Sequence, residues 1–219
     1  MVKLVRERIY EAIRDGITYG ELLPGERLVE NQLAQAYQAS RNTIRECLRQ
    51  LESEGLLTSE NHKGYRVSKY STKQIEEIYN LRWLLESYAA RLTAENITAS
   101  RLTPLEKSQK GCAKAAAKSD LKAWMAHNTA FHQFFYEHCG NDNLKILLDT
   151  LKRRIYRYQY IIITIPGHFD DYLRLHEKII AACRANDGGA AERYMKCHLN
   201  GVRKILLRHL NDFPMLRSA

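Results

Sequence analysis

Residues 30–57 constrain the fold of this chain most, because their pattern predicts two short helices joined by a tight turn. In the first segment Leu33, Ala34 and Tyr37 share one apolar face, so this helix should end near Tyr37. Ser40 then stands where its hydroxyl can accept a hydrogen bond from a free backbone amide of the next helix. A second helix therefore begins after Ser40.

The second helix has one face for packing and another for an anionic partner. Its apolar residues recur at three- and four-residue spacing, at Ile44, Cys47, Leu48 and Leu51. Arg41, Arg45 and Arg49 lie on other faces of the same helix. Gly55 stands where a left-handed residue commonly ends a helix, and Leu56 begins an apolar run. The helix thus stops there and a strand follows.

A two-stranded wing is predicted directly after this helix pair. Two short β-prone runs in residues 56–67 flank Asn61-His62-Lys63-Gly64, a loop with turn chemistry. This order is typical of a winged helix-turn-helix, whose second helix enters the major groove of DNA with its N-terminus first. Residues 40–45 would then face DNA. The alternative is that the arginines form the ordinary solvated face of an amphipathic helix pair.

These residues resemble the DNA-binding domain of the GntR family of bacterial transcription regulators. The similarity covers most of residues 3–69 and rests on the segments GELLPGERL at 20–28, LA at 33–34, SRNTIRE at 40–46 and LESEGL at 51–56. Asn42 and Thr43 depart from the family pattern by replacing a frequent threonine and a frequent proline at the base-facing tip. Gln38 stands where a glycine usually ends the first helix, so a non-glycine residue is expected in a left-handed or adjusted turn.

The resemblance implies a set of DNA-contacting residues. In the family, the arginines that match Arg41 and Arg45 contact bases or phosphates, and the glycine that matches Gly64 approaches the minor groove. The expected DNA-binding residues are Asn31, Ser40, Arg41, Asn42, Thr43, Arg45, Arg49, Lys63 and Gly64. The net charge of +9 adds little, because residues 1–69 carry nearly equal numbers of basic and acidic side chains. Phosphate neutralisation is local, so the positions of the arginines matter more than the total charge.

Composition favours a soluble protein with two domains, since the chain has 219 residues, of which 45% are hydrophobic and 27% charged. The longest uncharged apolar run, residues 158–166, is far shorter than the roughly 20 residues that a membrane span requires. Lys3 and Arg6 follow Met1 closely, so no signal sequence is expected and the protein should stay in the cytoplasm. Five cysteines without a Cys-x-x-Cys pair predict reduced core thiols.

The rest of the chain is expected to be almost wholly helical. Helices are predicted at residues 3–19, 73–95, 103–118, 121–139, 143–163, 169–186 and 189–210. Residues 68–72 form a short polar linker with a helix cap at Ser71 or Thr72. The predicted fold class is mainly α, with a winged helix-turn-helix domain at residues 1–69. An all-helical antiparallel bundle for effector binding, metal binding and dimerisation follows at residues 70–219.

A candidate metal site lies among the histidines of this bundle. Asn128 and His132 are one turn apart on the same face of one helix, while His176 and His198 lie in two later helices. The turn at residues 187–189 reverses the chain, so antiparallel helices can bring three imidazoles and an amide oxygen together. Imidazole suits Zn, Ni, Cu or Fe(II), and an amide oxygen is an acceptable fourth ligand. From the residues alone, the alternative of ordinary core or surface histidines is favoured.

A second resemblance favours the metal site. Residues 72–210 are similar to the FCD-type ligand-binding domain of the FadR branch of the GntR family, through NTAFH at 128–132, GN at 140–141, LHE at 175–177 and MKCHL at 195–199. In many members an Asp or Asn and three His at these positions hold a divalent metal. The implied ligands are Asn128, His132, His176 and His198, with zinc expected and nickel or another transition metal as alternatives. The common residue at position 128 is Asp, and the neutral Asn128 would leave the double charge of the ion to attract an anion.

Arg82 matches a position where the family commonly has an arginine on the first bundle helix. A guanidinium pairs bidentately with planar acids, so Arg82 is a candidate effector-binding residue for a small organic acid. The alternative is a structural ion pair with a residue such as Glu86. A shift of this helix at Arg82 would be transmitted through the short linker to the winged domain.

Two function classes remain open at this stage. The first is a ligand-responsive transcription regulator, by resemblance a repressor, which binds operator DNA as a homodimer. The second is an all-helical metalloenzyme in which the histidines activate water. No His-Glu-x-x-His motif is present, since Gln133-Phe134-Phe135-Tyr136 follows His132, and an enzyme would not explain the N-terminal third. The regulator is therefore the prediction, with no catalytic residue assigned.

Overall fold

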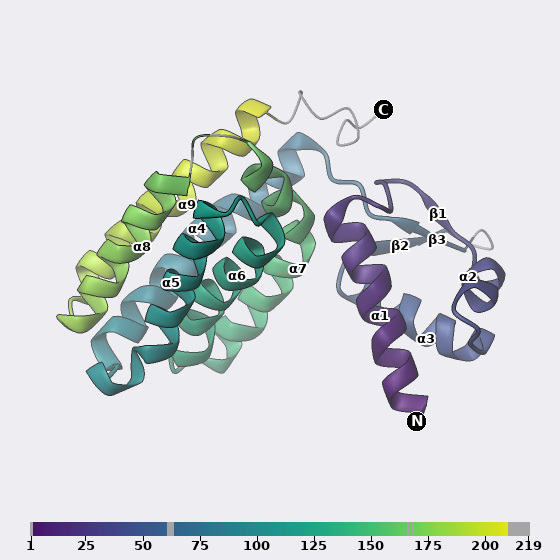
Figure 1. Ribbon diagram of the computed structural model, residues 1–219, viewed down its shortest axis with the longest axis horizontal. Coiled ribbons are helices and arrows are strands. Elements are labelled where there is room, and N and C mark those ends of the chain that lie inside the picture. The colour runs from purple at the N-terminus through teal and green to yellow at the C-terminus, as the bar shows by residue number, and fades with distance from the viewer. Residues whose placement is uncertain (1, 61–63, 166, 168, 210–219) are drawn as a thin grey trace.

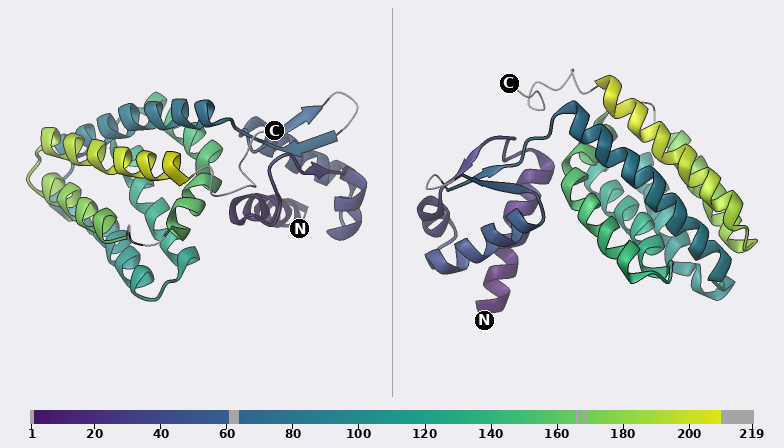
Figure 2. Two further views of the ribbon diagram at one scale, coloured as in Figure 1. Left: turned by 90° about the horizontal axis from the view of Figure 1, so that it is seen from above. Right: turned by 180° about the vertical axis from the view of Figure 1, so that it is seen from behind.

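The chain folds into a small N-terminal part and a larger helical bundle, which lie side by side (Figure 1). The computed structural model describes residues 2–60, 64–165, 167 and 169–209. Helices α1 to α3 and a small sheet form the N-terminal part, and helices α4 to α9 form the bundle (Figures 1 and 2). The predicted fold class, a winged helix-turn-helix followed by a helical bundle, is confirmed.

The N-terminal part contains the predicted helix pair and wing. Its helices are α1 (Val2–Tyr19), α2 (Glu30–Ala36) and α3 (Arg41–Ser53), and its strands are β1 (Arg27–Leu28), β2 (Leu57–Glu60) and β3 (Gly64–Val67). The strands pair in antiparallel fashion in the order β1-β3-β2. Strand β1 was not predicted, because two residues are too few to show an alternating pattern.

Apolar side chains from α1 and α3 form the core of this part. Ile13, Ile44 and Leu48 are each 0% exposed, and burial of such a side chain contributes about 1.5–3 kcal/mol. Cys47 and Leu51 are also buried, so the predicted packing face of α3 is confirmed. The arginines of α3 are left on the solvent side.

The backbone at both ends of α3 follows from the residues found there. The Ser40 hydroxyl accepts a hydrogen bond from the Thr43 amide at 3.1 Å, and Gly55 ends the helix region with a φ of 79°. Gln38 has a φ of 49°, so the expected left-handed non-glycine residue is present. Gly64 opens β3 with a φ of 85°, whereas the predicted DNA contact Lys63 lies outside the described residues.

The bundle follows after the short linker. Its elements are α4 (Thr72–Asn96), the 3-10 helix η1 (Ala99–Arg101), α5 (Thr103–Ala117), α6 (Leu121–His138), α7 (Asp142–Thr164), α8 (Phe169–Arg184) and α9 (Gly188–His209). The predicted bounds of the bundle helices lie within two residues of these, although η1 was not predicted. Side-chain caps explain the agreement, since Ser71 forms a capping box with Gln74, and Asp120 and Asn141 cap α6 and α7.

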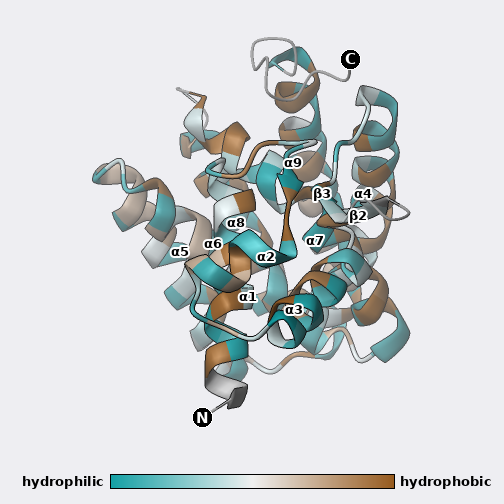
Figure 3. Cartoon of the chain, turned by 90° about the vertical axis from the view of Figure 1, so that its right-hand side faces the viewer, coloured by the Kyte–Doolittle hydropathy of each residue, from teal (hydrophilic) through white to brown (hydrophobic). Residues whose placement is uncertain are grey.

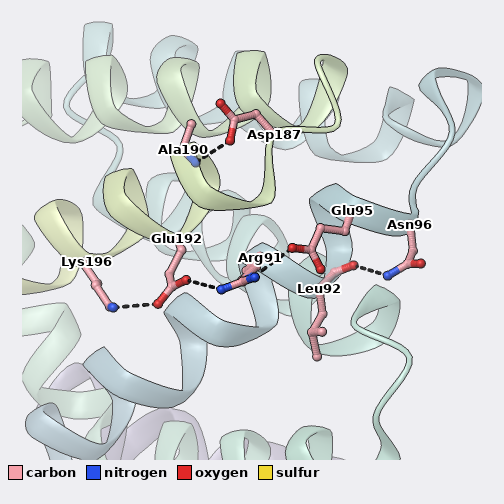
Figure 4. A network of polar contacts seen from close by, with 8 residues as sticks. All are labelled: Arg91, Leu92, Glu95, Asn96, Asp187, Ala190, Glu192 and Lys196. Carbon is pink, nitrogen blue, oxygen red and sulfur yellow. Dashed lines mark hydrogen bonds and ion pairs between the residues drawn. The ribbon is translucent and has the colours of Figure 1, made fainter.

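Helices α4 and α9 run antiparallel beside each other along one side of the bundle (Figure 2). A surface network crosses this pair, with Arg91 3.5 Å from Glu192 and Lys196 donating to Glu192 at 2.6 Å (Figure 4). Exposed ion pairs contribute little to stability. The buried residues Ala90 and Met195 between the helices therefore hold the pair together.

Helix α7 joins the bundle to the N-terminal part, where it lies next to α1 (Figure 1). The buried Arg157 of α7 donates hydrogen bonds to the backbone carbonyls of Ile17 at 3.2 Å and Leu22 at 2.7 Å. In the linker, the Tyr70 hydroxyl donates to the Gly55 carbonyl at 2.7 Å. The end of α1 is thus tied to the bundle, and the turn after α3 is tied to the linker.

The expectations about membrane spans and cysteines can also be compared with the structure. Among the described residues, none of the helices combines the length and apolarity needed to cross a membrane. Cys47, Cys112, Cys139 and Cys183 are free and buried, whereas Cys197 is free and exposed. The expectation of core thiols is therefore wrong for Cys197.

Replacing Arg157 with methionine should loosen the contact between α1 and α7. The carbonyls of Ile17 and Leu22 would lose a charged donor, which should cost about 1–3 kcal/mol and speed amide hydrogen exchange at residues 16–25. Denaturant unfolding and hydrogen exchange measure both effects. Arg154→Met, at an exposed position on the same helix, is the matched control, and equal exchange in the two variants would contradict the assigned role.

Candidate metal centre and DNA-binding surface

Three helices of the bundle bring the predicted histidines together. His132 lies on α6, His176 on α8 and His198 on α9, and one ring nitrogen from each lies within 4.8 Å of the others. The three side chains are between 0% and 3% exposed. Asn128 lies one turn before His132 and is also buried. It lines a small cavity together with His132 and His198. The sequence-predicted set therefore converges in the core.

The spacing of the imidazole nitrogens suits a small divalent ion. The Nε2 atoms of His132 and His198 are 3.3 Å apart. Two nitrogen ligands that each lie about 2.0–2.1 Å from a tetrahedral zinc ion are roughly 3.3–3.4 Å from one another. The distance between these two ring nitrogens thus matches that of a shared ion.

Several buried polar atoms of this cluster have no hydrogen-bond partner among the described residues. They are Asn128 Oδ1 and His176 Nε2, while His198 Nδ1, on the side of its ring away from His132, is a third. Buried polar atoms are nearly always paired, so the first two indicate a water, ligand or ion within the cluster. The donor set of imidazole nitrogens and an amide oxygen therefore fits a transition metal.

Neighbouring side chains hold two of the imidazoles in the orientation that a metal requires. His132 Nδ1 lies 2.9 Å from Glu86 Oε2, and His176 Nδ1 lies 3.0 Å from Gln109 Oε1. The Gln109 amide nitrogen donates to the Leu173 carbonyl at 3.0 Å, which fixes the amide orientation. The Gln109 oxygen must then accept the Nδ1 proton of His176, so its Nε2 lone pair faces the cluster. Such outer partners orient metal-binding histidines in many proteins.

Burial also keeps these imidazoles in the neutral form that binds metals. Burial and the neighbouring imidazoles lower the pKa of His176 and His198 well below the ordinary value. Burial lowers the pKa of His132 as well, although the carboxylate of Glu86 opposes this shift. Neutral imidazole is the ligand form, so no proton has to leave before an ion binds near pH 7.

Arg82 makes a structural ion pair and also borders the histidine cluster. Its Nε lies 2.5 Å from Glu86 Oε1, and the two side chains are 1% and 0% exposed. With the Gln159 amide oxygen turned toward it, Arg82 also donates from both terminal nitrogens, at 3.0 and 3.1 Å. The predicted alternative, an ion pair with Glu86, is therefore present, and the guanidinium faces the cavity at the same time.

The cavity beside the histidines is small. Its volume is about 20 Å³, and Trp124, Gln159, Ile162 and Tyr172 line it together with Arg82, Asn128, His132 and His198. A space of this size holds about one water molecule. An organic acid would need the walls to move.

Two further histidines of α6 do not join the cluster. His138 is bonded through Nδ1 to the Phe134 carbonyl at 2.8 Å, and His127 packs against Gly111. Neither belongs to the group of three converging rings. The contacts of His132 with Glu86 and of His176 with Gln109 were missed, because nothing local in the sequence marks a partner on another helix.

The predicted DNA-facing residues that the structure describes lie on α2, at the start of and along α3, and at the start of β3. Asn31, Ser40, Arg41, Asn42, Arg45, Arg49 and Gly64 are exposed, and Thr43 is half-buried. Figure 3 looks onto this end of the molecule and shows hydrophilic residues along α2 and α3. Their exposure leaves the arginines of α3 accessible, as the expected phosphate contacts require.

One contact on this surface was not predicted. Arg45 forms a bidentate ion pair with Glu30 of α2, with nitrogen–oxygen distances of 3.0 and 2.7 Å. The hydrogen bond from Arg45 lowers the pKa of Glu30, so the carboxylate stays charged. To reach a base, Arg45 must break its ion pair with Glu30, or the two side chains must move together.

Comparison with known families agrees with this architecture. Residues 5–67 match the model for bacterial regulatory proteins of the gntR family, and residues 77–201 match the FCD domain. The chain belongs to the GntR family of bacterial regulators and carries an FCD domain. The resemblance seen in the sequence is thereby confirmed.

Relatives that align with most of this chain are known. The HTH-type transcriptional regulator YdhC of Bacillus subtilis is 29% identical over 194 residues, which cover 88% of this chain and 87% of YdhC. The HTH-type transcriptional repressor RspR of Escherichia coli is 27% identical over 198 residues, which cover 90% and 87%. Among solved structures, E. coli McbR/YncC has a TM-score of 0.82 at 22% identity, covering 94% of this chain and 99% of McbR, and supports the fold.

Family membership decides between the two function classes. GntR proteins with an FCD domain are DNA-binding transcription regulators and not enzymes. The prediction of a regulator is confirmed, and the alternative of a metalloenzyme is set aside. The buried histidine cluster lies in the FCD domain and is consistent with a metal site there.

Removing a metal ligand should destabilise the bundle and abolish metal binding. We expect one zinc ion per chain, and an ion that binds only the folded state adds about 2.7 kcal/mol at 100 times its dissociation constant. Zinc titration and thermal melting with and without a chelator measure this for the wild type, His176→Ala and the control His138→Ala. The chelator should lower the melting temperature of the wild type and of His138→Ala, but not of His176→Ala. Absence of stoichiometric zinc in the wild type would show that the cluster is only a polar core.

Replacing Arg45 with alanine should weaken binding to an operator selected from random DNA by about 5- to 150-fold, the range for a base-reading arginine. Glu30→Gln should instead strengthen binding, because a carboxylate that competes for Arg45 and repels phosphate is gone. Both are measured by titration at constant salt. Unchanged operator affinity of Arg45→Ala would remove this side chain from the interface.

Proposed function

We propose that this protein is a repressor whose operator binding is controlled by a small carboxylate held at a divalent metal in the FCD domain. The functional division lies near residues 69 and 70, with DNA binding before it and effector binding and dimerisation after it. The observation that carries the proposal is the convergence of three buried imidazoles and Asn128 inside a DNA-binding regulator.

Asn128, His132, His176 and His198 are the proposed metal ligands. Their neutral donors suit zinc, and nickel or another transition metal would accept the same set. When bound, the divalent ion supplies a positive charge that the four ligands do not neutralise. The effector is therefore expected to be an anion, because charges in an apolar bundle are screened less than in water.

Arg82 also favours an anionic effector, although it is already paired with Glu86. Glu86 already occupies the Nε of Arg82, and the two terminal nitrogens of Arg82 donate to the Gln159 amide oxygen. A carboxylate that displaces the Gln159 amide would gain a bidentate partner. Arg82 is thus proposed as an effector-binding residue with its orientation set by Glu86.

The size of the cavity requires movement when an effector binds. Gln159 and Ile162 form part of its wall, and both lie on α7. On the same helix, Arg157 holds the end of α1 through Ile17 and Leu22. Displacement of α7 by an effector would therefore change the contact with the DNA-binding part.

A second copy of the chain is the proposed partner for the outer face of α4. Leu81, Leu84 and Tyr88 are 49%, 53% and 45% exposed on this helix. Three large apolar side chains on one exposed face are typical of an interface. A homodimer would present two recognition helices to the half-sites of a pseudo-palindromic operator.

Repression is proposed because the similar E. coli protein RspR is named a repressor. A dimer on an operator blocks access to the DNA it covers. An effector that changes the spacing of the two winged parts would then release the operator.

Zinc-loaded protein on its operator should respond to small carboxylic acids and not to neutral sugars. Allosteric coupling typically changes affinity by about 5- to 150-fold. Operator release is measured by fluorescence anisotropy for the wild type, for His176→Ala and for the control His138→Ala. We expect the wild type and His138→Ala to release DNA and His176→Ala to remain bound. A response to neutral ligands alone, or a full response of His176→Ala, would contradict the metal-anchored mechanism.

A further inference from the structure

A groove of 280 Å³ lies between the N-terminal part and the bundle. Tyr10 and Arg14 of α1 line one side, and Gln133 of α6 with Lys152 and Arg153 of α7 line the other. We propose that this groove is a second ligand site, which binds a small oxyanion with an apolar or aromatic portion, either a carboxylate or a phosphate ester. This site is separate from the histidine cluster and does not depend on a metal.

Lys152 is the first sign of an anion site. The residue is 9% exposed, and its ammonium donates to Gln133 Oε1 at 2.7 Å and lies 5.5 Å from the centre of the Tyr136 ring. Within the described part of the chain, no carboxylate comes within ion-pair distance of it. Burial lowers its pKa to about 8, which shows the cost of holding this charge away from water. A buried ammonium without a carboxylate is unfavourable unless an anion joins it.

Arg153 is the second sign. Its Nε is buried and has no hydrogen-bond partner among the described residues, while one terminal nitrogen donates to Thr150 at 3.3 Å. A buried N–H group without an acceptor costs free energy, and a guanidinium is suited to carboxylate and phosphate oxygens. Arg14, by contrast, is already paired with Asp15. Lys152 and Arg153 are therefore the expected anion-binding pair.

The acidic residue that lines the groove leaves room for an anion. Asp149 also lines the groove, but its carboxylate accepts from the Gln133 amide nitrogen at 3.1 Å. Gln133 thus lies between Asp149 and Lys152 and keeps them from pairing directly. The carboxylates of Glu86 and Glu137 also act on Lys152 from outside the groove, but neither lies within ion-pair distance of its ammonium. A ligand carboxylate or phosphate group in the groove can therefore be its direct ionic partner.

The walls of the groove suggest the rest of the ligand. Tyr10 donates its hydroxyl to Glu54 at 2.6 Å, and the Tyr156 hydroxyl lies 3.1 Å from that of Thr129. Both rings are therefore held in place on opposite sides, one on α1 and one on α7. Fixed aromatic walls and a few polar groups are typical of small-molecule sites, whose volumes start at about 300 Å³. An aromatic or apolar group between the rings would bury surface from both parts of the protein.

The groove and the histidine cluster use adjacent residues of α6. His132 points to the cluster and Gln133 to the groove. A ligand in the groove would contact α1 and α7 directly, so it would act on the junction between DNA-binding part and bundle without passing through the metal site.

Isothermal titration of the full-length protein with phenyl phosphate, benzoate and the uncharged benzyl alcohol tests the proposal at constant ionic strength. We expect saturable binding of at least one anion and none of the alcohol. Binding of phenyl phosphate alone would assign phosphate esters, and binding of benzoate alone would assign carboxylates. Arg153→Gln and Lys152→Met should each weaken that binding by at least about tenfold, since each removes a charged hydrogen-bond donor.

Two variants serve as controls. Arg154→Gln makes the same charge change at the next, exposed residue and should keep the wild-type affinity. His176→Ala should also keep it, which separates this site from the proposed metal site. The proposal is overturned if neither anion binds saturably, if Arg153→Gln and Arg154→Gln bind equally, or if His176→Ala loses binding.

Discussion

The buried ion pair between Arg82 and Glu86 is the interaction on which the candidate metal site depends. Both side chains are almost fully removed from water, and either charge alone would destabilise the bundle by several kcal/mol. The second oxygen of Glu86 faces His132 Nδ1, which turns the Nε2 of that ring toward His198. Because the two charges cancel, the site presents neutral donors, and the charge of a bound ion remains available to an anion.

Helix α7 places this chemistry next to the DNA-binding part. Residues 159 and 162 border the cavity, while Arg157 bonds to carbonyls at the end of α1. One face of α7 thus borders the proposed effector site, and Arg157 on the same helix is hydrogen-bonded to the winged part. A rigid helix that touches both sites can couple them without a flexible relay.

Most of the fold was predictable from local sequence signals, whereas the contacts between different helices were not. Apolar spacing and the caps at Ser40, Ser71 and Asn141 set the helix bounds, and these interactions lie within a few residues of each other. The ligand set followed from a family resemblance, and the structure brings those residues together. The pairing of Arg45 with Glu30 and of His132 with Glu86 joins different helices, so no local pattern indicates it.

Thermodynamic linkage between operator and effector tests the central claim most directly. The affinity of zinc-loaded protein for an active carboxylate is measured with and without operator DNA, and operator affinity is measured with and without that carboxylate. The account predicts that the two ratios are equal and lie between about 5 and 150, because coupling free energy is reciprocal. A carboxylate affinity that does not change when the operator is bound would contradict it.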